Sequence, residues 1–204
     1  MRLIGMLDSP YVRRVAISLR LLDLRHEHAP LSVFRDFEQF ASINAVVKAP
    51  TLVTDGGAVL LDSTLILEFL DRIAPRDLRL VPDDIDSFVL AQHLIGLALA
   101  ACEKSVQIVY EKNLRPAEKQ HQPWLDRVER QLLAAYDLLE AGYAGADGWL
   151  FEERMMQVDI TAAVAWRFTR SVLPETVPEA RYPALCALSR RAEATPAFLA
   201  APLD

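Results

Sequence analysis

Short apolar segments of alternating type fill the first third of the chain. Residues 3–7 and 26–31 have the length and pattern of strands, whereas residues 12–24 repeat apolar positions at the three- and four-residue steps of a helix. Gly56 and Gly57 separate two further strand patterns and predict a hairpin with a tight two-residue turn. The expected order is strand 3–7, helix 12–24, strand 26–31, helix 34–43, strands 51–54 and 58–61, and helix 63–73. A βαβ unit followed by a hairpin predicts an α/β domain with a mixed four-stranded sheet covered by helices.

The pattern changes after residues 75–84, which are rich in proline and acidic residues, as a linker is. Strand patterns disappear, and long segments with apolar residues at helical spacing follow. The expected helices are 85–111, 116–141, 158–172 and 182–194. We therefore predict two domains, an α/β domain over residues 1–76 and an all-α domain over residues 84–204.

Composition and charge narrow the class of protein. The chain has 204 residues, of which 52% are hydrophobic and 25% charged, with a formal net charge of −6. An acidic chain without a basic run argues against nucleic acid as a partner. No uninterrupted apolar stretch approaches the roughly 18 to 20 residues that a membrane span needs, and no signal-peptide pattern precedes the first strand. We expect a cytoplasmic protein with no membrane partner.

The cysteines and histidines do not suggest a metal site. Cys102 and Cys186 lie far apart and match no metal-ligand spacing, so we expect two reduced thiols and no disulfide. His93 and His121 have no carboxylate or thiol at ligand spacing. The sequence therefore predicts no bound metal.

Ser9 and Pro10 connect the first strand to the first helix. Proline suits the first helical turn, because its missing N–H would have no partner there. Ser9 then lies at the helix N-terminus, where unpaired N–H groups favour an anion. Two interpretations stay open, an ordinary N-cap and a hydroxyl that donates to a bound thiolate. Arg13 and Arg14 add positive charge nearby, although surface solvation explains Arg14 equally well.

Two later segments carry candidate ligand groups. Pro50 stands at the entrance of the strand 51–54, and a cis Ala49–Pro50 bond would offer the backbone of Ala49 to an extended peptide. Asp62 and Ser63 precede a helix, where the serine can cap the helix and hold a carboxylate while Asp62 meets an ammonium. Such a pair suits the head group of an α-amino acid, although each residue alone is explained by a cap or a turn.

These segments, Ser9-Pro10, Lys48-Ala49-Pro50-Thr51-Leu52 and Asp62-Ser63, resemble in order and spacing the cytosolic glutathione transferases. The resemblance covers the whole chain and implies a thioredoxin-like N-terminal domain followed by an all-α domain. Within the family, the chain is most similar to bacterial members with a serine at the catalytic position.

The resemblance also implies a role for each candidate residue. Ser9 would hydrogen-bond the sulfur of glutathione, the co-substrate. Ala49, beside Pro50, would pair its backbone with the cysteinyl part, and Lys48 would pair with the glycine carboxylate. Asp62 and Ser63 would hold the γ-glutamyl head group. A homodimer is implied as well.

Two positions depart from the family pattern. Ala45 stands where many members have a proline, which predicts a looser loop before Pro50 but removes no ligand atom. Met156 stands where members usually have a capping serine or threonine three residues before Asp159. We therefore expect Asp159 to find other partners and to be structural rather than catalytic.

The sequence and its resemblance predict conjugation of glutathione to small hydrophobic electrophiles through Ser9. One alternative is a protein that binds glutathione as a scaffold without turnover. Another is a related reaction on the same fold, either isomerisation or reductive dehalogenation. The sequence does not identify the electrophile.

Overall fold

The computed structural model describes residues 1–151 and 154–203 and contains two compact units. Unit 1 comprises residues 1–81 together with residues 194–203, and unit 2 comprises residues 82–193. Unit 1 holds a mixed four-stranded sheet in the order β2-β1-β3-β4, in which β1 and β2 are parallel and the other pairs antiparallel. Its elements are β1 Arg2–Ile4, α1 Pro10–Leu21, β2 Glu27–Ala29, α2 Phe37–Ala41, β3 Thr51–Val53, β4 Val59–Leu61, α3 Ser63–Ile73 and α8 Pro196–Leu199.

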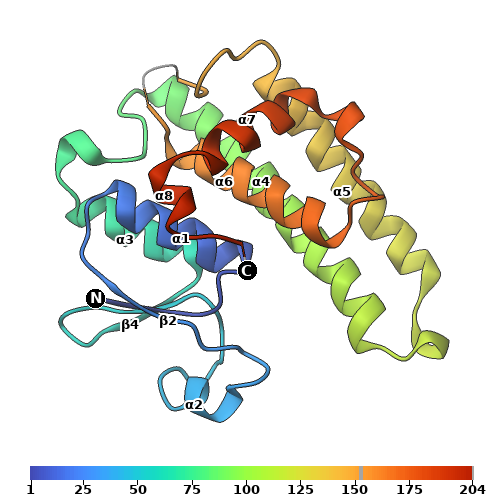
Figure 1. The fold of residues 1–204 in the computed structure, drawn as a ribbon, viewed down its shortest axis with the longest axis horizontal. Helices are drawn as coiled ribbons and strands as arrows, with labels where there is room; N and C mark the ends of the chain where they lie inside the picture. Colours follow the sequence, from blue (N-terminus) through green and yellow to red (C-terminus); the bar gives the residue numbers. More distant parts are fainter. Residues whose placement is uncertain (152–153, 204) are drawn as a thin grey trace. The chain divides into compact units, whose positions relative to one another are not determined.

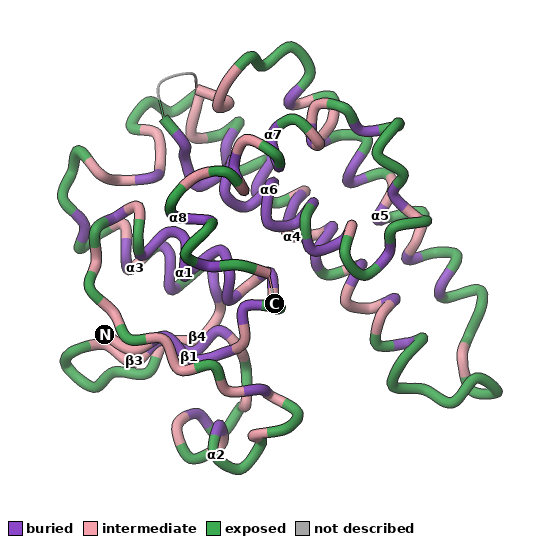
Figure 2. Tube along the Cα trace, viewed as in Figure 1, coloured by how far each residue is buried: buried purple, intermediate pink, exposed green. Residues whose placement is uncertain are grey.

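Helix α1 is the central helix of unit 1. It packs against α3, and the two lie together on one side of the sheet, with α2 on the other (Figure 1). Every residue from Val12 to Leu19 is buried, so α1 has almost no solvent face (Figure 2). A helix buried on most of its sides must also bury its polar residues, which here include Arg13 and Arg14.

The strands are shorter than the sequence patterns predicted. β1 ends at Ile4 because Gly5 takes a φ of +136°, where other residues are strained. β2 ends before Pro30, which has no N–H for a ladder bond. The predicted two-residue turn was wrong. Residues 54–58 connect β3 to β4, and the hydroxyl of Thr54 accepts from the amide of Ala58 at 3.0 Å.

The regular structure of unit 2 over residues 82–151 and 154–193 is helical, as predicted. Its elements are α4 Ile85–Leu114, α5 Gln122–Tyr143, α6 Gln157–Val172 and α7 Pro183–Glu193. The 3-10 turns η2 Ala117–Lys119 and η3 Glu179–Arg181 lie between them, and η1 Arg76–Leu78 follows α3 in unit 1. The predicted helix 116–141 starts later, at Gln122, because Pro123 occupies its first turn. α4 packs against both α5 and α6.

By length and composition alone, α4 is the one helix among the described residues that could cross a membrane. Long core helices of soluble proteins pass the same test. Its buried residues recur at three- and four-residue steps, as in Ala91, Leu94, Ala98 and Cys102, which is the pattern of a helix packed on one face against α5 and α6.

Asp159 anchors the start of α6, and the structure gives it the alternative partners that the sequence required. Its carboxylate accepts from the amide of Met156 at 2.9 Å, the amide of Leu150 at 3.0 Å and the hydroxyl of Tyr143 at 3.3 Å. Burial is the largest influence and raises the pKa of Asp159, even though these hydrogen bonds act in the opposite direction. All three of these partners belong to unit 2, so the role of Asp159 is structural, as expected.

Residues 194–203 return to unit 1 after the helical unit and are called the return segment below. The sequence grouped them with the all-α domain 84–204, whereas the contacts group them with residues 1–81. The short helix α8 in this segment lies against α1 (Figure 1). Phe198 and Ala201 are buried there, so the return segment contributes to the core of unit 1.

Candidate functional site

Ser9 is the N-cap of α1. Its side-chain oxygen accepts a hydrogen bond from the amide of Val12 at 3.4 Å, and Pro10 occupies the first turn, as the sequence predicted. A hydroxyl has two acceptor positions and one donor hydrogen. Capping uses only an acceptor position, so it leaves the hydrogen available for an anion. The two interpretations of Ser9 are therefore compatible.

Gly5 brings the start of α1 close to the segment that contains Ala49. A Cβ atom on Gly5 would lie 2.6 Å from a methyl carbon of Val12 and 3.1 Å from the Cβ of Ala49. Only glycine fits between these two residues without displacing them. The Ala49–Pro50 peptide bond is cis. No backbone hydrogen bond of Ala49 is found within the part of the chain that the structure describes.

Asp62 caps α3 and has an unusual backbone conformation. Its carboxylate accepts from the amide of Thr64 at 2.9 Å, so the cap is Asp62 and not Ser63, which is the first residue of the helix. This corrects the expectation that the serine caps. Asp62 has a φ of +72°, a conformation that costs about 1 to 3 kcal/mol in a non-glycine residue and concentrates at functional sites.

Lys48 and Asp62 form an ion pair in which Nζ lies 3.3 Å from the carboxylate. Partial burial of Asp62 alone would raise its pKa, but the hydrogen bond from Thr64 and the ion pair with Lys48 outweigh it. The pKa of Asp62 is therefore below its ordinary value. A carboxylate that stays ionised and partly accessible can receive an ammonium group.

Arg14 joins α1 to the first residue of α3. Its Nη1 donates to the hydroxyl of Ser63 at 3.4 Å, and both residues are buried. The solvated alternative for Arg14 was therefore wrong, because its side chain is only 2% exposed. The positive charge of Arg14, hydrogen-bonded to Ser63, favours an anion at the N-terminus of α3. The sequence contained one signal for this role, the position of Arg14 inside a helix that was expected to pack against others.

The loop before Pro50 is held by side chains although it lacks the family's proline. Asn44 donates to the hydroxyl of Thr51 at 2.9 Å and accepts from the amide of Val46 at 3.1 Å. The hydroxyl of Thr51 in turn donates to the carbonyl of Lys48 at 2.7 Å. These bonds connect both ends of the loop, so the expected loosening at Ala45 is offset by Asn44.

The contacts therefore bring all six predicted residues into one region of unit 1. Gly5 lies close to Ala49 and to Val12, whose amide donates to Ser9. Lys48 pairs with Asp62, and Ser63 is linked to α1 through Arg14. Such a region has a hydroxyl donor, an acidic group and a buried cation in separate places. Groups of these kinds can bind an ammonium, a carboxylate or a thiolate.

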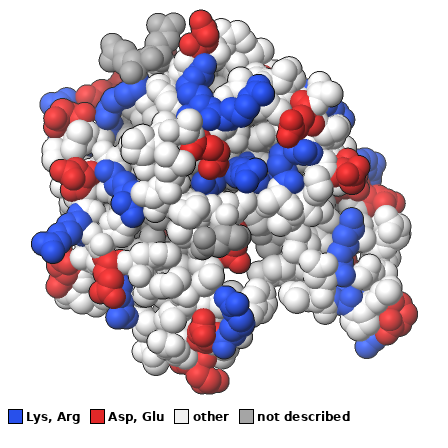
Figure 3. Space-filling view, in the orientation of Figure 1, with Lys and Arg blue, Asp and Glu red and all other residues white. Residues whose placement is uncertain are grey.

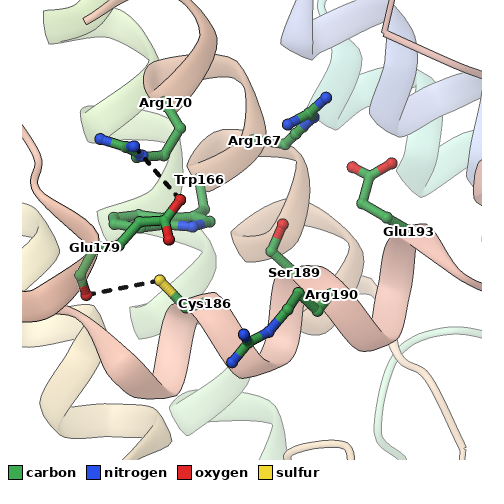
Figure 4. A pocket seen from close by; sticks show the side chains of 8 residues that line it. All are labelled: Trp166, Arg167, Arg170, Glu179, Cys186, Ser189, Arg190 and Glu193. Atoms are coloured by element: carbon green, nitrogen blue, oxygen red, sulfur yellow. Dashed lines mark hydrogen bonds and ion pairs between the residues drawn. The ribbon is translucent and has the colours of Figure 1, made fainter. Parts of the chain in front are cut away.

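A separate pocket of about 390 Å³ lies in unit 2, between α6, α7 and η3 (Figure 4). Arg170 pairs there with Glu179, and the thiol of Cys186 donates to the carbonyl of Glu179 at 3.7 Å. Burial and the nearby Glu179 raise the pKa of Cys186, which makes this thiol a poor nucleophile. None of the predicted site residues lines this pocket.

Cysteines, histidines and carboxylates are also present outside the predicted site. Cys102 and Cys186 are not joined in a disulfide, and Cys102 is buried. No group of three histidine, cysteine, aspartate or glutamate residues within residues 1–151 and 154–203 is arranged to hold a metal. Basic and acidic side chains are interspersed on the face drawn in Figure 3.

The fold defines a class of proteins, those in which a thioredoxin-like α/β unit precedes a helical unit. Comparison of the sequence with protein-family models narrows this class. Residues 3–77 match the glutathione S-transferase N-terminal domain, and residues 122–191 match the glutathione S-transferase C-terminal domain. The two matches lie in the expected order and together cover most of the chain. This protein belongs to the glutathione S-transferase family.

Similar proteins of known structure support this assignment over the full length. A glutathione S-transferase from Methylobacterium radiotolerans, solved with glutathione sulfonate, is 28% identical with a TM-score of 0.91, and the match covers 98% of this chain and 93% of that one. A family member from Pseudomonas fluorescens with bound glutathione is 26% identical with a TM-score of 0.82, covering 100% and 98%. The Escherichia coli protein YibF, described as an uncharacterized GST-like protein, is 28% identical over 176 residues, which is 85% of each chain.

Proposed function

We propose that this protein is a glutathione transferase of the serine type, which conjugates the thiolate of glutathione to small hydrophobic electrophiles. The observation that carries the proposal is the position of Ser9, an N-cap whose hydroxyl hydrogen is not used by the cap. Membership of the family and the glutathione bound to its Pseudomonas relative support glutathione as the co-substrate.

The task assigned to Ser9 is modest in energy. A thiol with an ordinary pKa is only a few per cent ionised at neutral pH, and lowering that pKa by about two units corresponds to about 2.7 kcal/mol. A hydrogen bond to a charged group contributes about 1.5 to 3 kcal/mol. The hydroxyl of Ser9, aided by the positive end of α1, is therefore sufficient. The thiolate sulfur then forms a bond to the electrophilic carbon as the leaving group departs.

The remaining predicted residues bind the rest of glutathione in this proposal. The backbone of Ala49, next to Pro50, pairs with the cysteinyl part. The ammonium of the γ-glutamyl head group meets Asp62, and its carboxylate meets Ser63, with Arg14 behind it. Lys48 has two possible roles. It either leaves Asp62 and pairs with the glycine carboxylate of glutathione, or stays paired with Asp62 and competes with the ammonium of glutathione for that carboxylate. These two roles predict opposite changes in the Km for glutathione when Lys48 is replaced by methionine.

The proposal extends to the assembly and location of the protein. Each unit exposes large apolar side chains that a partner subunit would cover, among them Leu65 on α3 and Ile85 and Val89 on α4. Ile85 is 69% exposed. We therefore include a homodimer in the proposed function, and we keep with it the cytoplasmic location expected from the sequence.

The deciding experiment is an ultraviolet difference titration of bound glutathione against pH, with the wild type beside Ser9→Ala. We expect a thiolate signal well below the pKa of free glutathione in the wild type and its loss in the variant. If the wild type binds glutathione tightly but shows no thiolate signal, the interpretation as a glutathione-binding scaffold is favoured over the transferase. An unchanged signal in Ser9→Ala would remove Ser9 from the chemistry.

A further inference from the structure

Arg13 is a buried cation on α1 for which the proposed function has no use. Its side chain is 0% exposed. Nε donates to the carbonyl of Ala201 at 2.8 Å, and the guanidinium lies 5.3 Å from the centre of the Phe198 ring. Both partners belong to the return segment. Arg13 therefore connects α1 to a residue 188 positions later in the sequence.

The partners of Arg13 are themselves fixed within unit 1. Phe198 is fully buried, and Ala201 is 1% exposed. A buried guanidinium is costly unless acceptors and aromatic faces surround it. We therefore expect the contacts of Arg13 with the return segment to persist in the folded state, unlike those of an arginine on a surface loop.

The same residue is bonded to Ser9 through the backbone. The amide of Arg13 donates to the carbonyl of Ser9 at 2.9 Å, which closes the first turn of α1. The hydroxyl of Ser9 accepts a hydrogen bond from the amide of Val12, the residue before Arg13. Arg13 thus belongs both to the turn that carries Ser9 and to the contact with the return segment.

We infer that Arg13 is a positioning residue, which holds the return segment against α1 and thereby fixes the turn that aims the hydroxyl of Ser9. The role of Ser9 in this inference rests on the proposed function. Without Arg13, Ser9 keeps its hydroxyl, but the turn that carries it is free to move. A misplaced donor stabilises the thiolate less, so the pKa of the bound thiol rises toward that of free glutathione.

The first test compares Arg13→Met, Arg13→Lys and the control Arg20→Met, which replaces an exposed arginine on the same helix. In Arg13→Met we expect faster hydrogen exchange at the amides of residues 12 and 13, a higher pKa of the bound thiol and a fall of about tenfold to a hundredfold in kcat/Km. Arg13→Lys keeps a cation that can donate to Ala201 and restores part of each effect. Arg20→Met leaves all three unchanged.

The second test approaches the contact from the return segment. Phe198→Leu keeps most of the buried apolar volume but removes the ring face under the guanidinium. Because Arg13 and Phe198 are in contact, the effects of Arg13→Met and Phe198→Leu on first-turn exchange are expected to be less than additive in the double variant. Should Arg13→Met fail to fold, Phe198→Leu alone is expected to raise the exchange rate and the thiol pKa, by smaller amounts.

The outcomes separate this inference from the proposed function. A folded Arg13→Met with wild-type exchange in the first turn and an unchanged thiol pKa would overturn the positioning role, as would strictly additive effects. If glutathione bound to the wild type shows no lowered thiol pKa, the proposed function fails instead. The exchange measurements on Val12 still decide whether Arg13 fixes the turn.

Discussion

Buried polar groups are arranged differently in the two units. In unit 2, three buried hydroxyls pair with one another: the hydroxyl of Tyr136 lies 2.6 Å from that of Thr169, which lies 2.7 Å from that of Ser105. In unit 1, Arg14 and Ser63 form a buried pair, and the half-buried Ser9 keeps a hydroxyl hydrogen that its cap does not use. The three hydroxyls of unit 2 satisfy one another, whereas the hydroxyl of Ser9 can still donate to a ligand.

The difference separates polar groups that specify a core from those that can bind a ligand. A closed network stabilises one arrangement, because each member satisfies another in a region of low dielectric constant. An open set leaves donors and acceptors that a bound molecule can satisfy. Replacing members of unit 2's network should therefore change stability, whereas replacing Ser9 should change the rate of conjugation.

The largest expected effect is on activity, at Ser9. Ser9→Ala is expected to lower kcat/Km for glutathione conjugation by about a hundredfold or more, the usual cost of losing one donor to a developing or bound anion. Ser9→Asp is the matched control, because aspartate is an equally good N-cap but has no proton to donate at neutral pH. We expect Ser9→Asp to retain the stability of α1 and to lose activity. Activity retained in both variants would contradict the comparison.

The next effect is on stability, at Asp159. Asp159→Ala leaves the amides of Met156 and Leu150 without their acceptor, which is expected to lower the free energy of unfolding by about 2 to 4 kcal/mol. Urea denaturation measures this loss. The pKa of glutathione bound to the folded variant should equal that of the wild type, and a shifted thiol pKa would show that Asp159 also affects the site.

A smaller loss of stability is expected at Tyr136. Tyr136→Phe keeps the ring contacts with Trp166 and Tyr182 but removes the hydroxyl that bonds to Ala165 and Thr169. The free energy of unfolding should fall by about 1 kcal/mol, measured by urea denaturation. Thr169→Val in the same background tests closure of the network, because its effect should be smaller there than in the wild type.

The smallest effect concerns the pH dependence of stability at Asp62. Because its pKa is lower in the folded state, Asp62 adds stability that is fully present above its ordinary pKa and is lost as pH falls through the folded pKa. Asp62→Asn still caps α3 but does not titrate. The stability difference between wild type and Asp62→Asn should be constant from about pH 5 to 8 and shrink below about pH 4. Lys48→Met should weaken this dependence, and a difference that grows in acid would be inconsistent with a lowered pKa.

Elements with strong local signals were predictable from the sequence. The predicted helix 63–73 and the observed α3 have the same limits, because Asp62 caps one end and Ala74-Pro75 stops the other. α8 has only four residues, too few to show a helical period, so its return to unit 1 left no pattern to read.

The sequence and its resemblance to the family suggested the members of the candidate site but not the contacts between them. Ser9, Ala49 and Asp62 were recognisable from motifs, and their roles toward glutathione stay predictions. The burial of Arg14 had only one weak signal, its position in a helix expected to pack, because single-sequence patterns do not encode which helix faces become buried. The sequence also left open whether Ser9 caps α1 or donates to a thiolate. Only the structure shows that the cap uses an acceptor position of the hydroxyl, so that both roles are compatible.

The return segment has a consequence for how the protein is made. During synthesis, residues 1–81 leave the ribosome first, and the return segment follows only after the whole of unit 2. Domains usually fold in the order in which they are translated. Here the contacts of Arg13 with the carbonyl of Ala201 and the ring of Phe198 cannot form until the return segment has been translated. The unit that is translated first is therefore completed last.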